Sequence, residues 1–387
     1  MATRLKTGLD RWTALFEMGG KGRIVPMEGL RGIAILMVLL VHHAFRFEAW
    51  AAPGSWAAGY AEFAHAAGQA GVDLFFALSG YLVYSLALAR RGTVAEFIVR
   101  RLRRIYPPFL AAMAVYVAIF IAASGVAKWP DGGEFWFVGR SLLLLPGVFE
   151  IEPVMTVAWS LSYELAFYLT VPLLVAGLHL ERWTRRRRVA WIAALSLGYV
   201  AAALIWFPGQ LDWLPLKLWD RPRFLLFAAG MLAWEHFDSL PVKSASGWKQ
   251  AGAALLMGIA IAACYPLADP LHQQPWPSLT RVLLLGAGSY ALILAAFSGQ
   301  GRLAGALSLA PLRWLGNCSY SFYLAHSLGV HAAGALADRL IPAAQWQGLG
   351  FWLTLPATAL AAATVTVPLY LFVERPFSLR KPALKAG

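Results

Sequence analysis

Residues 29–43 read GLRGIAILMVLLVHH, an apolar helix with a cation at one end and an imidazole well inside it. About 20 apolar residues are needed to cross a bilayer, so this segment spans one only if its ends snorkel. Helical steps of about 100° place Arg31 and His42 on one face, about 16 Å apart along the axis, while His43 points about 100° away. Because an ionisable side chain in lipid is costly, His42 is predicted to be functional, with a hydrogen-bonded core histidine as the alternative.

The composition indicates an all-α polytopic membrane protein. Of the 387 residues, 59% are hydrophobic and 14% are charged, and the mean hydropathy is +0.59. Such values are far from those of soluble domains. Lys and Arg lie in short blocks between long apolar runs, so the net charge of +13 reflects the positive-inside rule and not nucleic-acid binding. Neither Cys264 nor Cys318 has disulfide or metal-ligand spacing, so no metal is expected.

About ten transmembrane helices are predicted to bundle around an internal cavity, with both termini in the cytoplasm. This orientation puts most of the 33 Lys and Arg residues on the cytoplasmic side. The apolar stretch 136–148 is too short to span and is expected to be interfacial or re-entrant. The predicted spans are residues 30–47, 69–89, 106–125, 157–178, 189–207, 221–236, 250–267, 280–298, 313–336 and 348–372.

The chain is thus divided into three parts, all attached to the cytoplasmic (inner) membrane. Residues 1–25 form a cytoplasmic or interfacial segment, residues 26–377 form the transmembrane domain, and residues 378–387 form a cytoplasmic tail.

Polar side chains in four predicted spans lie at similar depth in the outer half of the membrane. Polar groups at that depth are expected to face a bundle interior or a water-filled cavity. Ser and Tyr in spans often only join helices by hydrogen bonds, which is the alternative for them. A buried carboxylate near an imidazole is harder to explain structurally, so Glu164 is predicted to be functional. The polar residues of this layer are His42, Ser79, Ser160, Ser162, Tyr163, Glu164, Tyr323 and His326.

Charged residues near the cytoplasmic ends of the spans form a second feature. Residues 97–108 read FIVRRLRRIYPP, and the guanidinium groups of Arg101 and Arg104 share one helix face where they can grip phosphate oxygens. The alternative is a stop-transfer block that contacts anionic lipid. The run 185–188 lacks such a pattern and is interpreted as topogenic only. Glu28, one turn before Arg31, is expected to pair with it.

The chain resembles the acyltransferase-3 family of integral membrane proteins over nearly its whole length, about residues 26–377. The resemblance depends on the joint order of six short elements. They are EGLRG at 28–32 followed by His42, FFALSGY at 75–81, RLRRIYP at 101–107, WSLSYE at 159–164, SYSFYLAH at 319–326 and ERP at 374–376.

The resemblance implies an O-acyltransferase. It would move an acyl group, most often acetyl, from cytoplasmic acyl-CoA to a hydroxyl of an extracytoplasmic acceptor such as a glycan or a lipid-linked saccharide. Membrane lipids would surround it, and no metal would be needed. Some relatives carry a fused SGNH esterase-like domain, and this chain is expected to be the stand-alone form.

The residues suit that chemistry. Arg101 and Arg104 are expected to bind the phosphates of acyl-CoA, with Arg31 and Ser79 along the path of its pantetheine arm. Imidazole titrates near neutral pH, so His42 is the predicted general base, and an acyl-histidine intermediate is the alternative mechanism.

Further residues are assigned around this centre. Glu164 or Tyr163 would orient His42 or stabilise the tetrahedral intermediate. Trp159, Ser160, Tyr323 and His326, together with Glu28, complete the predicted site.

A transporter or flippase for a lipid-linked or sugar substrate is the alternative function. It should show paired helix interruptions in both halves of the chain, and a purely structural membrane protein would not need polar groups at one depth.

Overall fold

The computed structural model describes residues 14–17, 23–89, 92–124, 133–149, 151–205, 222–237, 247–267, 275–341 and 348–379. Every named element within these ranges is helical, as expected. Most of the predicted segment 1–25 and residues 380–387 of the predicted tail lie outside the described residues. The longer helices are α2 (Val25–Phe47), α3 (Trp56–Ala67), α4 (Ala70–Leu88), α5 (Val94–Ser124), α7 (Trp159–Gly177), α8 (Arg185–Ile205), α9 (Phe224–Phe237), α10 (Gly247–Ala262), α11 (Pro275–Phe297), α14 (Ser319–Leu340) and α15 (Leu349–Pro368). The shorter ones are α6 (Gly133–Leu142), α12 (Gly301–Leu307), α13 (Ala310–Asn317) and the π-helix η5 (Leu369–Ser378).

The protein is a multi-pass membrane protein. Seven helical stretches in the described part of the chain are long and apolar enough to cross a bilayer. Helices α9 and α10 have 14 and 16 residues, fewer than a straight span needs. The ten predicted segments each overlap a helix. The segment 313–336 is not one continuous helix, because helical structure is interrupted at Cys318 between α13 and α14. Helix α6, which overlaps the stretch 136–148 expected to be interfacial, has only 10 residues.

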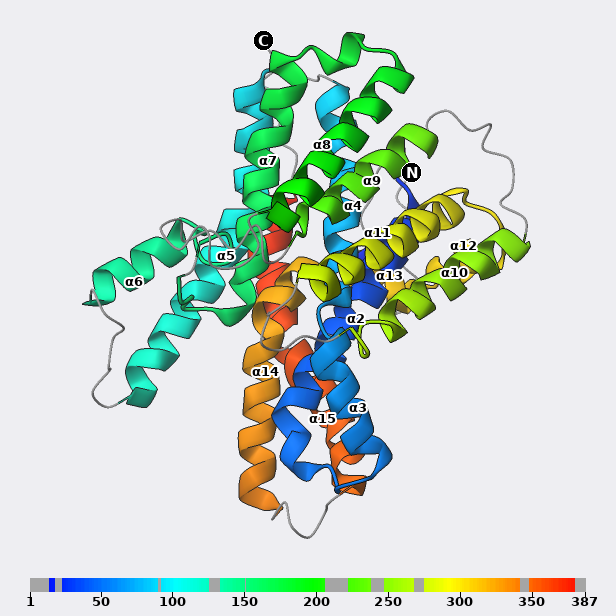
Figure 1. Ribbon diagram of the computed structural model, residues 1–387. Coiled ribbons are helices and arrows are strands. Elements are labelled where there is room, and N and C mark those ends of the chain that lie inside the picture. The colour runs from blue at the N-terminus through cyan, green and yellow to red at the C-terminus, as the bar shows by residue number, and fades with distance from the viewer. Residues whose placement is uncertain are drawn as a thin grey trace, which may run out of the picture.

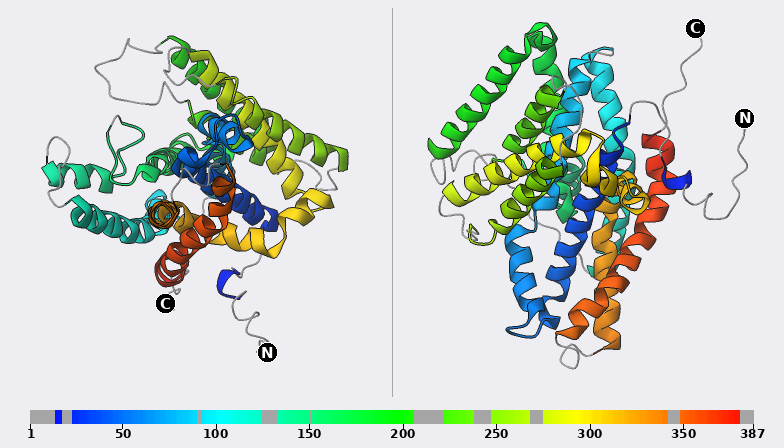
Figure 2. Two further views of the ribbon diagram at one scale, coloured as in Figure 1. Left: turned by 90° about the horizontal axis from the view of Figure 1, so that it is seen from below. Right: turned by 90° about the vertical axis from the view of Figure 1, so that its right-hand side faces the viewer.

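Helix α2 lies at the centre of the bundle and packs against α3, α4, α13 and α14. Figure 1 shows α3, α14 and α15 at the lower end of the molecule and α7 and α8 at the upper end. The side view in Figure 2 agrees with this division. Since α2 reaches from the middle of the bundle to its lower end, one face of this helix contributes side chains at two levels.

Glycines set the distance between α2 and the helices after α11. A Cβ on Gly32 would lie 2.1 Å from the carbonyl oxygen of Leu312, and one on Gly316 would lie 1.8 Å from that of Glu28. Backbones this close leave no room for a side chain, as at other small-residue contacts between membrane helices. Gly32 of the EGLRG element and Gly316 therefore bring α13 against α2, which fixes where Arg31 enters the bundle.

We predict that Gly32→Ala destabilises the protein, because the added methyl group must displace the α13 backbone. Overpacking of this kind costs about 1–3 kcal/mol. The thermal unfolding midpoint of the detergent-purified protein should fall. Gly252→Ala is the matched control, since Gly252 lies in α10 with no atom within 4 Å of the added Cβ. Equal midpoints for the two variants would contradict this account of the packing.

Candidate functional site

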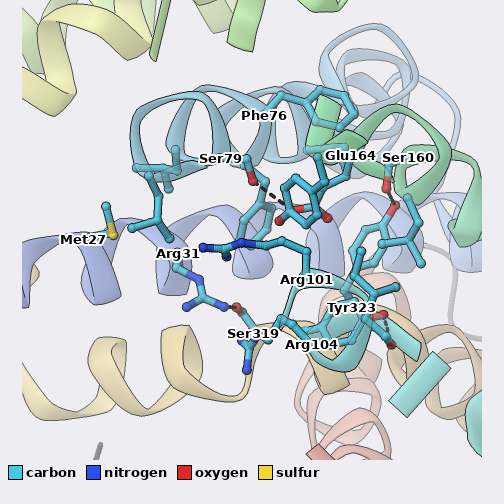
Figure 3. A pocket seen from close by; sticks show the side chains of 18 residues that line it. Met27, Arg31, Phe76, Ser79, Arg101, Arg104, Ser160, Glu164, Ser319 and Tyr323 are labelled. Carbon is cyan, nitrogen blue, oxygen red and sulfur yellow. Dashed lines mark hydrogen bonds between the residues drawn. The ribbon is translucent and has the colours of Figure 1, made fainter. Parts of the chain in front are cut away.

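A cavity of about 140 Å³ lies among α2, α4, α5, α7 and α14, and we call it the arginine cavity (Figure 3). It brings together residues that are far apart in the sequence. Seven of the residues selected from the sequence line it, namely Arg31, Ser79, Arg101, Arg104, Ser160, Glu164 and Tyr323.

Three guanidinium groups face this cavity with unused hydrogen-bonding capacity. Arg31 Nη2 donates to Ser319 Oγ at 2.8 Å. Arg101 lies between two aromatic rings, with its guanidinium carbon 5.2 Å from the centre of Phe97 and 5.6 Å from that of Tyr168. Among the described residues, no carboxylate lies within ion-pair distance of Arg31 or Arg101. A guanidinium carries five N–H donors, so both retain donors for an anionic ligand.

Glu164 belongs to the arginine cavity. Its Oε1 accepts a hydrogen bond from Ser79 Oγ at 2.9 Å and another from the hydroxyl of Tyr168, one helical turn further along α7. The carboxylate is thus anchored opposite the arginines, as Figure 3 shows for Ser79 and Glu164.

Glu374 is a functional candidate that the sequence reasoning missed. It lies in η5, its side chain is 0% exposed, and its Oε1 is 3.0 Å from Arg104 Nη2. Its Oε2 accepts from the backbone N–H and the Oγ of Ser321, at 3.0 and 2.6 Å. The second terminal nitrogen of Arg104, Nη1, is buried without a hydrogen-bond partner. Glu374 thus holds Arg104 in place, and its only sequence signal was the ERP element. Tyr168, Ser319 and Tyr320 also line the cavity and were not selected.

His42 lines a second cavity of about 490 Å³, which we call the histidine cavity. Its ring nitrogen Nδ1 lies 2.8 Å from the carbonyl oxygen of Val38 and therefore carries the proton. Nε2 is then the basic atom. The ring of His326 is buried edge-on to that of His42, with 4.5 Å between the ring centres. Trp159 also lines this cavity.

The two cavities lie on one face of α2. Arg31 lines the first and His42 the second, as the helical spacing predicted. Among the described residues, Val72 of α4 and Tyr323 of α14 line both. The expected single hollow is therefore two chambers with a common wall.

Three expected contacts are not formed. Glu164 and His42 line different cavities, so Glu164 does not orient the imidazole. Tyr163 is 0% exposed, packs against aromatic rings such as that of Trp159, and lines neither cavity. Glu28 does not pair with Arg31. It accepts hydrogen bonds from Arg23, Arg313 and Asn317 and so joins α2 to α13.

Two further polar groups, outside both cavities, have structural roles. His43 is buried with both ring nitrogens occupied, by Thr358 Oγ1 at 3.1 Å and the carbonyl oxygen of Phe351 at 2.9 Å. Arg188 binds both carboxylate oxygens of buried Glu235, at 2.5 and 2.9 Å. The run 185–188 is therefore not only topogenic.

Within the ranges that the structure covers, no group of His, Cys, Asp or Glu is arranged to hold a metal.

We predict that Glu374→Gln destabilises the protein, because the partly buried cation of Arg104 would lose its buried carboxylate partner. Breaking such a pair costs about 3–5 kcal/mol. Thermal unfolding in detergent measures the loss. Glu96→Gln is the matched control, since the 4.0 Å pair of Glu96 with Arg100 is exposed and contributes less than about 1 kcal/mol. A Glu374→Gln variant as stable as the control would show that the buried pair does not hold η5.

The comparisons with known proteins identify a family for this chain. A family model described as an acyltransferase domain matches residues 25–372. The exopolysaccharide production protein ExoZ of Rhizobium meliloti is 29% identical, over 81% of this chain and 90% of its own length.

Two further relatives differ in how much of their own length the chain covers. The peptidoglycan O-acetyltransferase OatA of Listeria monocytogenes is 26% identical over 79% of this chain but only 49% of its own length, so the chain spans about half of that relative. The acyltransferase MdmB of Streptomyces mycarofaciens is 29% identical over 78% of this chain and 76% of its own length. No solved structure matches the chain. Because the family model matches residues 25–372 of the 387, the chain belongs to this family of membrane acyltransferases.

Proposed function

We propose that this enzyme moves a short acyl group, most often acetyl, from cytoplasmic acyl-CoA to a hydroxyl of a glycan or other envelope acceptor outside the inner membrane. The observation that carries the proposal is the wall shared by a cavity rich in arginine and a cavity containing a basic imidazole. ExoZ and OatA, whose names refer to exopolysaccharide and peptidoglycan, support a polysaccharide acceptor. Ten spans with both termini in the cytoplasm belong to the same proposal.

The arginine cavity suits the donor. Acyl-CoA carries several phosphate charges, and buried guanidinium groups form strong charge-assisted hydrogen bonds with phosphate oxygens. Arg31 and Arg101 have no carboxylate partner within the described structure, and Arg104 has an unused buried nitrogen. Glu164 keeps Ser79 and Tyr168 in fixed positions beside them.

The histidine cavity suits the acceptor and the chemistry. His42 Nε2 takes the proton of the acceptor hydroxyl as its oxygen attacks the thioester carbonyl carbon. The new C–O bond forms, the C–S bond breaks, and the thiolate of CoA leaves and receives the proton from the imidazolium. In the alternative mechanism, Nε2 itself first takes the acyl group and then passes it to the acceptor.

A transporter or flippase would not need the acyl-transfer chemistry that the family membership of this chain implies. The acyltransferase is therefore the function that we propose.

Donor binding should depend on the arginines that face the cavity. We predict that Arg31→Gln and Arg101→Gln each weaken acetyl-CoA binding by about tenfold or more, since a charge-assisted hydrogen bond contributes about 1.5–3 kcal/mol. Titration calorimetry of the detergent-purified protein measures this. Arg103→Gln is the control, because Arg103 is exposed and lies outside the cavity. Unchanged affinity in both cavity variants would remove acyl-CoA from this site.

The general base should be separable from donor binding. We predict that His42→Gln lowers acetyl transfer by about 10²–10⁴-fold, the usual contribution of a general base, and leaves acetyl-CoA affinity within about twofold. Transfer is measured as radioactive acetyl groups in the polysaccharide of everted membrane vesicles. His179→Asn is the control, because His179 lies outside both cavities at a positive φ of 53° that Asn tolerates. Normal transfer by His42→Gln would refute the assignment.

A further inference from the structure

Among the described residues, two line both cavities and so form the wall between them. Val72 of α4 and Tyr323 of α14 are in this position. We propose that these two side chains form the passage for the acyl group and that its width sets the acyl-chain length that the enzyme transfers. This inference rests on the proposed function, because it assumes that acyl-CoA binds in the arginine cavity.

Tyr323 is fixed from both sides of the wall. Its hydroxyl donates to the carbonyl oxygen of Val157 at 2.6 Å and accepts from Ser160 Oγ at 2.8 Å. Val157 lines the histidine cavity, and Ser160 lines the arginine cavity. The ring is therefore held against the beginning of α7 by two hydrogen bonds, and its exposed fraction is only 7%. A ring held in this way cannot swing aside without breaking both bonds.

Val72 has little freedom to move away. It follows Gly71, where an added Cβ would lie 2.6 Å from the carbonyl oxygen of Ala34 in α2. Helix α4 is therefore packed backbone to backbone against α2 next to Val72. The position of this side chain is set by the contact between two helices, and substitution of Val72 changes the width of the passage rather than the course of the chain.

Trp159 stiffens the acceptor side of the same wall. Its ring lies under the guanidinium group of Arg223, whose carbon is 4.2 Å from the ring centre. Arg223 Nε is in turn 3.8 Å from Asp73 Oδ1, and both charged side chains are buried. Asp73 is adjacent to Val72 in the sequence. The buried pair of Asp73 with Arg223 therefore links Trp159 to the part of α4 that carries Val72.

A stiff passage selects by the size of the leading group. The acyl group is the free end of acyl-CoA and must pass Val72 and Tyr323 before the thioester carbon comes within reach of His42. Each additional methylene in a confined apolar site changes discrimination by about 10–200-fold. The phosphates stay with the arginines whatever the acyl length. Longer acyl-CoA should therefore bind as well as acetyl-CoA and be transferred much more slowly.

The test compares acetyl-, propionyl- and butyryl-CoA in everted vesicles that contain the envelope polysaccharide. The ratio of butyryl to acetyl transfer should be low in the unaltered enzyme and should rise at least tenfold in Val72→Ala. Tyr323→Phe frees the ring from both hydrogen bonds and should raise the ratio as well. Val83→Ala is the matched control, since Val83 is a buried valine of α4 that lines neither cavity. It should leave the ratio unchanged.

The outcomes separate this inference from the proposed function. If the unaltered enzyme neither binds acetyl-CoA nor transfers acetyl groups, the proposed function fails. If it does both, and the ratio stays the same in the folded Val72→Ala and Tyr323→Phe proteins, the passage inference is overturned while the function stands. Should Tyr323→Phe fail to fold, Ser160→Ala removes one of the same two hydrogen bonds and decides in its place.

Discussion

The partial burial of three guanidinium groups inside an apolar helix bundle is the constraint on which the rest of the structure depends. A cation in such surroundings must be paired, hydrogen-bonded or in contact with water or ligand. Glu374 supplies one carboxylate by reaching Arg104 from η5, at the far end of the chain, and Ser319 supplies one hydroxyl to Arg31. Guanidinium N–H groups that have no carboxylate partner within the described structure can bind a polyanion in this cavity. In our proposal that polyanion is acyl-CoA.

Helix α2 links that cation cluster to the imidazole. The two groups lie on one face of the helix, and the glycines of the EGLRG element fix the helix against α12 and α13. The arginine cavity and the histidine cavity are therefore arranged along a single helix. In our proposal this explains how one enzyme joins a cytoplasmic thioester to an acceptor outside the membrane without a large conformational change.

The sequence predicted the helical class and the common face of Arg31 and His42, because helical periodicity and hydropathy are local properties. It also selected seven residues of the arginine cavity, through the order of short motifs and the cost of polar groups in spans. It failed where the answer depends on lateral position. Depth along a span places Glu164 level with His42, but depth does not say towards which neighbour a side chain points.

Other differences have similar causes. Glu374 was missed because its partner Arg104 is 270 residues away in a different helix, a contact that no local pattern reveals. The break at Cys318 was not foreseen, because the polar run Asn317–Ser319, although preceded by Gly316, was interpreted as part of one continuous span over 313–336. Glu28 was assigned to Arg31 from its helical spacing, whereas Arg313 and Asn317 reach it from α13 after tertiary packing.

The most direct measurement of the central claim is a cryo-electron microscopy structure with a non-hydrolysable acetyl-CoA analogue bound. The account predicts phosphate density beside Arg31, Arg101 and Arg104, and the acyl end between Val72 and Tyr323, pointing towards His42. Density for the analogue at any other place on the protein, with the arginine cavity unfilled, would contradict it.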